Sequence, residues 1–93
     1  MSLSINDAVI WNETAEGVSL YHTETGDFRT LNDTGAKIWL LVASDGERDK
    51  IISRLSLQYA GRNAVLNGRI RTDVSQFIDS MVSAGLLAEN EAA

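Results

Sequence analysis

The sequence predicts an α+β fold in which a three-stranded antiparallel meander precedes three helices. Short apolar–polar alternations fill the first third of the chain, and glycine-containing loops separate them, as is typical of hairpin-connected strands. The remainder repeats apolar residues at spacings of three and four, which is the period of a helix. A winged helix-turn-helix packs these elements economically, with the meander as the wing. From 93 residues and 44% apolar content we expect one domain over residues 1–93, with its core at residues 8–87.

The three strands are expected at residues 8–11, 17–22 and 27–31. In the second strand, Val18 and Leu20 share one face while Ser19 and Tyr21 share the other, which is the pattern of a strand buried on one side. The loop before the third strand ends at Gly26, which is free to adopt a positive φ angle. Because short loops connect the strands in order, the first and third strands should form the two edges of the sheet.

The first predicted helix begins at a cap that Asn32 or Asp33 provides, because either side chain can accept a bond from the free amides of a first turn. Residues 36–43 are apolar on nearly every side, which indicates a helix at the centre of the core. The second helix begins near Glu47 and Asp49, where the helix dipole favours acidic residues. Its apolar stripe consists of Ile51, Ile52, Leu55 and Tyr59.

The last predicted helix follows a loop at residues 60–68 and begins between Arg69 and Asp73. Its apolar stripe consists of Ile70, Val74, Phe77, Ile78, Met81 and Val82. Gly85 lies where a left-handed residue often ends a helix, and Leu86 is expected to pack back over the final turn.

Four large apolar residues are interpreted one at a time. Trp39 and Phe77 lie on the inner faces of their predicted helices and are expected in the core. Phe28 belongs to an edge strand, where its side chain either packs inward or faces solvent. Leu57 lies off its helix stripe and is expected to be an ordinary exposed leucine.

Charge and cysteine content exclude several classes of protein. Eight basic residues against thirteen acidic ones give a net charge of −5, and the only local basic concentration is Arg62, Arg69 and Arg71. Nucleic acid is therefore not an expected partner, because phosphate binding needs a concentrated basic surface. The absence of cysteine excludes disulfides and zinc–thiolate sites and fits a reducing cytoplasm. Without a secretion signal or a membrane-length apolar run of ~20 residues, we expect a cytoplasmic protein with no membrane partner.

Residues suited to catalysis are scarce. His22 is the only histidine, which excludes a histidine pair, and it is expected at the surface or packed within the hairpin. A helix start explains the acidic cluster of Asp45, Glu47 and Asp49. The serines have no base near them in sequence, and the glycines do not form a phosphate-binding loop. We therefore expect no catalytic residue, no metal site and no cofactor, and the chain is not predicted to be an enzyme.

Two segments resemble a known family. Residues 26–39 read G-D-F-R-T-L-N-D-T-G-A-K-I-W, which resembles the hallmark G-x-Y/F-x-x-L-N-x-T-G-A-x-I-W of PqqD-like proteins. Residues 73–87 read D-V-S-Q-F-I-D-S-M-V-S-A-G-L-L, which is similar to the family's closing pattern, and the Asp45–Gly46 turn and the Ile51–Leu55 helix lie between them. The resemblance covers about residues 18–87, and the longer polar stretch at residues 61–68 departs from it.

This resemblance implies a winged-helix RiPP recognition element, a module that binds the leader segment of a ribosomally synthesised precursor peptide and presents it to a modifying enzyme. The leader would add as an antiparallel strand to residues 27–31, in a groove facing the last helix. The implied backbone and edge positions are Asp27, Phe28, Arg29, Thr30 and Leu31. The implied positions on the last helix are Arg69, Arg71 and Asp73 at the groove mouth, with Val74, Phe77, Ile78 and Met81 shared between apolar pockets and core. We expect Arg69 or Arg71 to contact leader carboxylates.

The residues themselves point the same way, because an edge strand carries unpaired backbone groups that can template another strand. The opposite interpretation is that Asp27 and Arg29 only protect this edge from aggregation. An unoccupied edge can also pair with a second copy, giving an edge-paired homodimer.

Several functions remain open. The residue pattern of the motifs looks most like that of leader-binding proteins of lasso-peptide pathways. Their partner would be a separate leader peptidase. A PqqD-type peptide chaperone in pyrroloquinoline quinone biosynthesis shares the same mechanism. A winged-helix DNA-binding regulator would present Arg69, Arg71, Ser75 and Gln76 to a major groove, but the acidic Asp73 and Asp79 stand on the same helix. A regulatory subunit or enzyme fragment without a peptide role is the remaining class.

Overall fold

The computed structural model describes residues 2–90 of the chain. Its elements in chain order are β1 (Ser2–Ile5), β2 (Val9–Thr14), β3 (Gly17–His22), β4 (Phe28–Leu31), α1 (Asp33–Ser44), α2 (Arg48–Ala60), α3 (Ala64–Ser83) and β5 (Leu87–Asn90). Strands β2, β3 and β4 form an antiparallel sheet in that order, and β1 pairs with β5 in a separate two-stranded sheet. The α+β class and the order of a meander followed by three helices are confirmed, whereas the winged-helix description stays a prediction.

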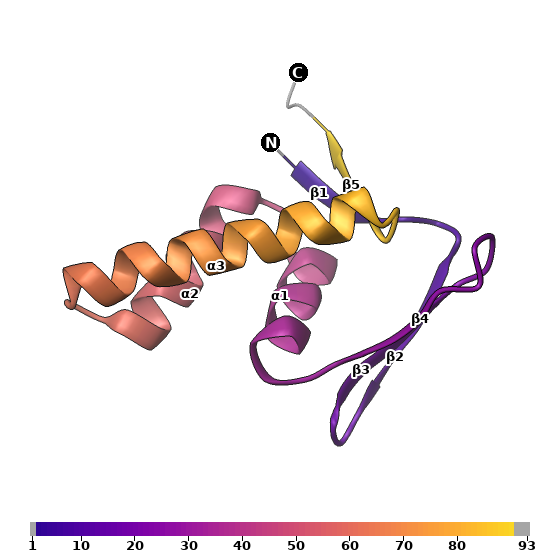
Figure 1. Cartoon of the computed structure of the whole chain (residues 1–93), viewed down its shortest axis with the longest axis horizontal. Coiled ribbons are helices and arrows are strands. Elements are labelled where there is room, and N and C mark those ends of the chain that lie inside the picture. The colour runs from indigo at the N-terminus through magenta and orange to yellow at the C-terminus, as the bar shows by residue number, and fades with distance from the viewer. Residues whose placement is uncertain (1, 91–93) are drawn as a thin grey trace.

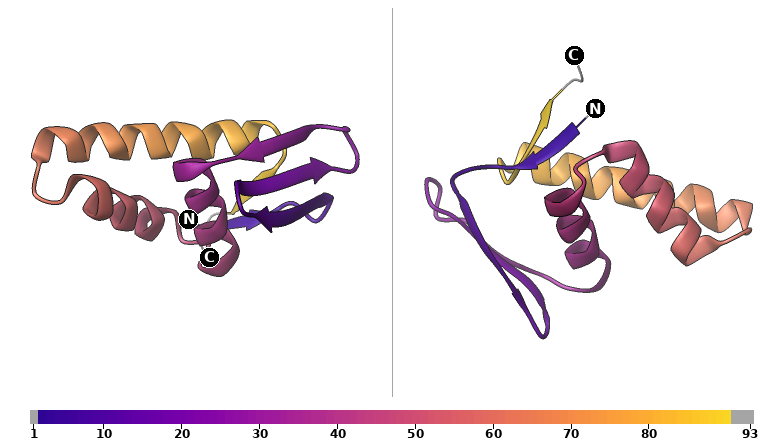
Figure 2. Two further views of the ribbon diagram at one scale, coloured as in Figure 1. Left: turned by 90° about the horizontal axis from the view of Figure 1, so that it is seen from below. Right: turned by 180° about the vertical axis from the view of Figure 1, so that it is seen from behind.

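The meander packs against one side of α1, and α2 lies on the other side of the same helix (Figures 1 and 2). In β3, Val18 and Leu20 are buried and Tyr21 is exposed, so the predicted alternation is confirmed. Gly26 has a φ angle of 78° and donates its amide to His22 O at 2.8 Å, as the hairpin requires. His22 is buried in this hairpin, where its Nδ1 atom accepts bonds from the amides of Glu24 and Thr25 at 3.2 and 3.3 Å.

Helix α1 forms the centre of the core, as its composition predicts. Trp39 is fully buried, and its ring meets that of Trp11 edge to face, with 6.2 Å between the ring centroids. The Trp39 indole N–H has no hydrogen-bond partner among the described residues, so packing alone holds this ring. At the start of α1, Asn32 occupies the cap position without a side-chain capping bond, and Asp33 takes a positive φ angle of 45°.

The predicted loop at residues 60–68 is wrong in most of its length, because α3 already begins at Ala64. Asn63 caps the helix, and its Oδ1 atom accepts a bond from Leu66 N at 3.0 Å. Gly68 lies inside the helix, where a glycine costs only about 1 kcal/mol relative to alanine. The cap and the long helix that follows outweigh this cost.

The far end of α3 follows the predicted cap. Gly85 has a φ angle of 77°, and its amide donates to Val82 O at 3.0 Å. The Leu86 amide donates to Met81 O at 3.0 Å, and the Leu86 side chain is fully buried. These two bonds satisfy carbonyls that the end of the helix would otherwise leave unpaired.

The two ends of the described chain form structure that the sequence did not predict. Leu3 on β1 pairs with Glu89 on β5, and Leu3 and Leu87 are both buried. The Leu3 amide also donates to Gly46 O at 2.6 Å. Residues near both ends of the described chain therefore take part in the fold, while residues 91–93 lie outside the described residues. Within residues 2–90, no helix has the length and apolar character needed to cross a membrane.

Candidate functional site: a strand edge beside an apolar cavity

Strand β4 uses only one of its two edges within the described part of the chain, because it pairs with β3 and with no other strand. The His22 amide donates to Asp27 O at 2.8 Å, and the register continues with Leu20 opposite Arg29. Hydrogen-bonded and non-bonded pairs alternate in an antiparallel ladder, so the backbone N–H and C=O groups of Phe28 and Thr30 point away from β3. These two residues offer donors and acceptors to a further strand.

The side chains of β4 alternate between the two faces of the sheet. Leu31 is buried toward the helices, and Arg29 lies on the same side, where its Nε atom is 3.0 Å from Asp27 Oδ2. Phe28 points to the opposite face and is 65% exposed. The edge is therefore flanked by one ion pair on the helix side and by an exposed aromatic ring on the outer side.

Next to this edge, three helices line an open, largely apolar cavity of about 520 Å³. Its lining residues are Thr34, Gly35 and Ile38 of α1, Tyr59 of α2, and Leu66, Ile70, Asp73, Val74 and Phe77 of α3. The cavity begins where β4 leads into α1. A Cβ atom on Gly35 would lie 3.4 Å from the Phe77 ring and 3.7 Å from Leu31 Cβ. The end of β4, the start of α1 and the wall of α3 are therefore in direct proximity.

Tyr59, one of the polar lining residues, is in contact with Lys37 of α1. Lys37 Nζ donates a hydrogen bond to Tyr59 Oη at 2.7 Å, and the same ammonium group lies 4.9 Å from the centroid of the Tyr59 ring. The hydrogen bond from Lys37 lowers the pKa of Tyr59 below its usual value. The cavity thus combines apolar walls with a phenol, a nearby ammonium group and the Asp73 carboxylate.

The structure separates the α3 residues that the sequence grouped together. Asp73, Val74 and Phe77 line the cavity. Ile78 and Met81 are buried in the core. Arg71 bonds Asn67 Oδ1 at 2.9 Å and borders a shallow hollow with Ile52 and Gln76 instead. Arg69 is exposed and does not line the cavity.

Six of the lining residues were not among the predicted site residues, namely Thr34, Gly35, Ile38, Tyr59, Leu66 and Ile70. Tyr59 and Ile70 belong to apolar stripes that the sequence predicts. An apolar stripe that is wider than the buried core requires can therefore indicate a binding surface. Leu66 fell in a predicted loop and gave no such signal. Within residues 2–90, no group of three or more His, Cys, Asp or Glu side chains is arranged to hold a metal ion.

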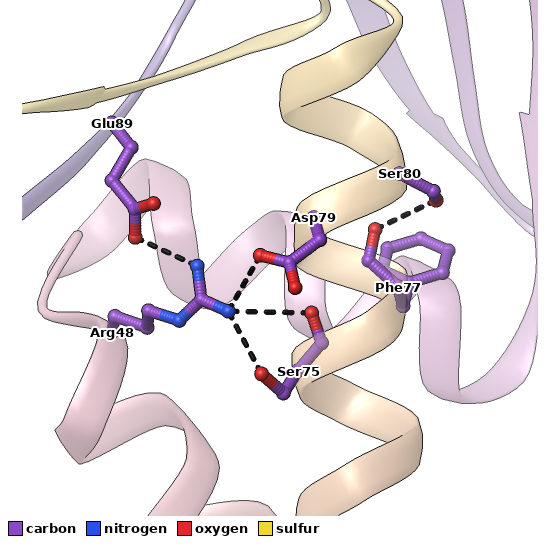
Figure 3. A network of polar contacts seen from close by, with 6 residues as sticks. All are labelled: Arg48, Ser75, Phe77, Asp79, Ser80 and Glu89. Atoms are coloured by element: carbon purple, nitrogen blue, oxygen red, sulfur yellow. Dashed lines mark hydrogen bonds and ion pairs between the residues drawn. The ribbon is translucent and has the colours of Figure 1, made fainter.

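The back of α3 is fixed by Arg48 of α2 (Figure 3). Its guanidinium donates to Glu89 Oε2 and to Asp79 Oδ1, both at 2.7 Å, and to Ser75 Oγ at 2.8 Å. Burial opposes the charge of Arg48, but the bonds to Asp79 and Glu89 outweigh it and raise its pKa. Figure 3 shows Phe77 on the opposite side of α3. One face of α3 is therefore tied to α2 and β5, and the other faces the candidate site.

These elements define a small α+β module in which an unpaired strand edge adjoins a cavity walled by the last helix. The family model described as coenzyme PQQ synthesis protein D (PqqD) matches residues 17–87, and the chain belongs to this family. The predicted family membership is confirmed.

Two solved structures share this fold. One is TbiB1 in complex with the TbiA(beta) leader peptide, with a TM-score of 0.80 and 22% identity, covering 96% of this chain and 99% of that chain. The other is lasso peptide synthetase B1 complexed with the leader peptide, with a TM-score of 0.78 and 17% identity, covering 96% and 100%. No curated protein matches the chain.

Proposed function

We propose that this protein binds the leader segment of a ribosomally synthesised precursor peptide as an added strand on β4 and presents it to a modifying enzyme. The observation that carries the proposal is the outward-facing backbone of Phe28 and Thr30 beside an apolar cavity. The two solved structures of similar fold, each a complex with a leader peptide, support it. The enzyme we propose as partner is a lasso-peptide leader peptidase.

Typical interaction free energies indicate what the strand edge and the cavity each contribute to leader binding. Phe28 and Thr30 each offer one N–H and one C=O, and a hydrogen bond contributes about 0.5–1.5 kcal/mol net. Micromolar affinity requires about 8 kcal/mol after the costs of association are met. Burying one large apolar side chain adds about 1.5–3 kcal/mol. We therefore infer that the edge sets the register of the guest and that apolar leader residues in the cavity supply affinity and selectivity.

A PqqD-type peptide chaperone in pyrroloquinoline quinone biosynthesis is the second candidate, and the description of the matching family favours it. Both candidate functions use the same edge of β4, and they differ in the peptide that is bound. The net charge of −5 favours a peptide over nucleic acid as the guest.

The experiment is a calorimetric titration of the protein with a synthetic leader from the precursor encoded beside its gene. Thr30→Pro removes an outward-facing N–H without removing a bond to β3, so it should weaken leader binding by about two- to tenfold, the contribution of one hydrogen bond. Thr30→Val is the matched control, because it changes the side chain and keeps the amide. In NMR spectra of isotope-labelled protein, addition of the leader should change the chemical shifts of backbone amides mainly at residues 27–31 and along the cavity. Equal affinity for both variants, or shifts elsewhere, would refute strand addition to β4.

A further inference from the structure

The outer face of the meander, which points away from the helices, carries a row of three exposed apolar side chains. Ile10 of β2 pairs with Tyr21 of β3, and Tyr21 pairs with Phe28 of β4. Their side chains are 65%, 42% and 65% exposed. The three residues border a shallow hollow of about 180 Å³. We call these three residues the outer row.

Charged side chains are absent from this face within strands β2 to β4, all of which the structure describes. Asn12, Ser19 and Thr30 occupy the neighbouring row, and Glu13 and Arg29 belong to the opposite face. The chain as a whole is 23% charged, so an uncharged face is not an average surface. An apolar patch with a polar uncharged border is typical of a protein interaction site.

The size of this face limits what can occupy it. Three strands spaced about 4.8 Å apart, with about five residues each at 3.3 Å per residue, present roughly 200–250 Å². A stable dimer buries about 800 Å² on each partner. A second copy on this face alone therefore falls short, and the occupant must contact additional surface beside the outer row.

The strand edge provides that additional surface. Phe28 belongs to the outer row, and its backbone is also one of the groups offered to a guest strand. A guest paired with β4 would extend the sheet, and every second guest side chain would continue the outer face next to Phe28. Binding of a leader thus enlarges the outer face of the sheet in line with the outer row.

Given the function proposed above, on which this inference rests, we propose that the enzyme that processes the leader docks on the outer face of β2, β3 and β4. Its docking surface is flat, apolar and uncharged at its centre, to match the outer row. It contacts the outward side chains of the bound leader at the same time. The enzyme consequently binds the loaded protein more tightly than the empty one, because only the loaded protein presents the complete surface.

The test uses the full chain, the synthetic leader and the purified processing enzyme whose gene neighbours that of this protein. The double variant Ile10→Thr and Tyr21→Thr removes two members of the outer row and keeps a β-branched residue in each strand. Leu57→Thr is the control, because Leu57 is a comparably exposed leucine on α2, at 70% exposure. Calorimetry then measures leader affinity and, separately, the affinity of the enzyme for the loaded protein.

We expect the double variant to bind the leader within about twofold of wild type and to lose about tenfold or more in enzyme affinity, as is usual for central anchors of an interface. Leu57→Thr should change neither quantity. If the double variant and Leu57→Thr bind the enzyme with equal affinity, docking on the outer row is overturned. The proposed leader binding is not affected by that result. Failure of the wild type to bind the leader would instead overturn the proposed function.

Two further measurements keep the outcome unambiguous. The single variant Tyr21→Thr should show a smaller loss in the same direction, and it replaces the double variant if that protein melts early. Light scattering reports the oligomeric state. A wild-type dimer that the double variant converts to a monomer would assign the outer row to self-association and overturn the proposal.

Discussion

The ring of Phe77 on α3 lies 3.4 Å from the position that a Cβ atom would occupy on Gly35 of α1. Both residues line the cavity, so the missing side chain at residue 35 contributes directly to its open space. Gly35 is within a helix and has no positive φ angle, so the backbone does not require a glycine there. The space beside Phe77 is therefore the feature that a larger side chain would change.

A size series at Gly35 should separate stability from binding. Gly35→Ala is expected to raise the free energy of unfolding by about 0.5–1 kcal/mol, because alanine favours the helix and its Cβ makes an ordinary contact with Phe77. Gly35→Leu should fill part of the cavity and weaken leader binding by about tenfold, since one lost apolar anchor costs at least 1.4 kcal/mol. Denaturant unfolding and calorimetric titration measure the two effects. Unchanged leader affinity in Gly35→Leu would remove the cavity from the binding site.

Local patterns in the sequence were sufficient for the elements that depend on near neighbours. The alternation around Val18 and Leu20 predicted the strand, and the glycine at position 85 predicted how α3 ends. The edge position of β4 followed from short loops in chain order. The start of α3 is harder to predict, because Gly68 is typical of a loop, although Asn63 caps a helix that runs through it.

The remaining features depend on residues that are distant in sequence. Strands β1 and β5 come from opposite ends of the chain, and neither has a pattern that predicts its partner. The cavity is formed by three helices, so its lining depends on their packing rather than on any one stripe. The orientation of α3 likewise depends on a distant residue, because Arg48 of α2 binds Asp79 and Ser75 on the side away from Phe77.

Arg48 should be a main source of stability for the α2–α3 pair. Its side chain is 12% exposed and that of Glu89 is 18% exposed, so Arg48→Met would leave Glu89 largely buried without its cation. Breaking a buried ion pair from one side costs about 3–5 kcal/mol, and exposure of Asp79 places the expected loss near the lower figure. Urea unfolding measures the loss. Arg54→Met, at an exposed position of the same helix, should cost less than about 0.5 kcal/mol, and equal losses would contradict a special role for Arg48.

The Lys37–Tyr59 contact predicts a titration that can be observed directly. The hydrogen bond from Lys37 lowers the pKa of Tyr59 from 10.0, so its phenolate should form at lower pH than that of a free tyrosine. Because the folded pKa lies below the unfolded one, the stabilising contribution is present above pH 10.0 and is lost as the pH falls through the folded pKa. In a Tyr21→Phe background, which leaves Tyr59 as the single tyrosine, phenolate absorbance follows this group alone. Lys37→Gln should move the midpoint to higher pH, and an unmoved midpoint would show that the contact is absent in solution.

The pairing of the chain ends predicts that a residue near the N-terminus stabilises the whole fold. Leu3 is 4% exposed and packs in the same core cluster as Leu87 and Val42. Leu3→Ala should lower the free energy of unfolding by about 2–4 kcal/mol, because it removes buried methyl groups and leaves a cavity. Leu57→Ala is the matched control at an exposed leucine and should cost less than about 0.5 kcal/mol. Denaturant unfolding of both variants decides the point, and a Leu3→Ala protein as stable as the control would mean that β1 does not pack on the core in solution.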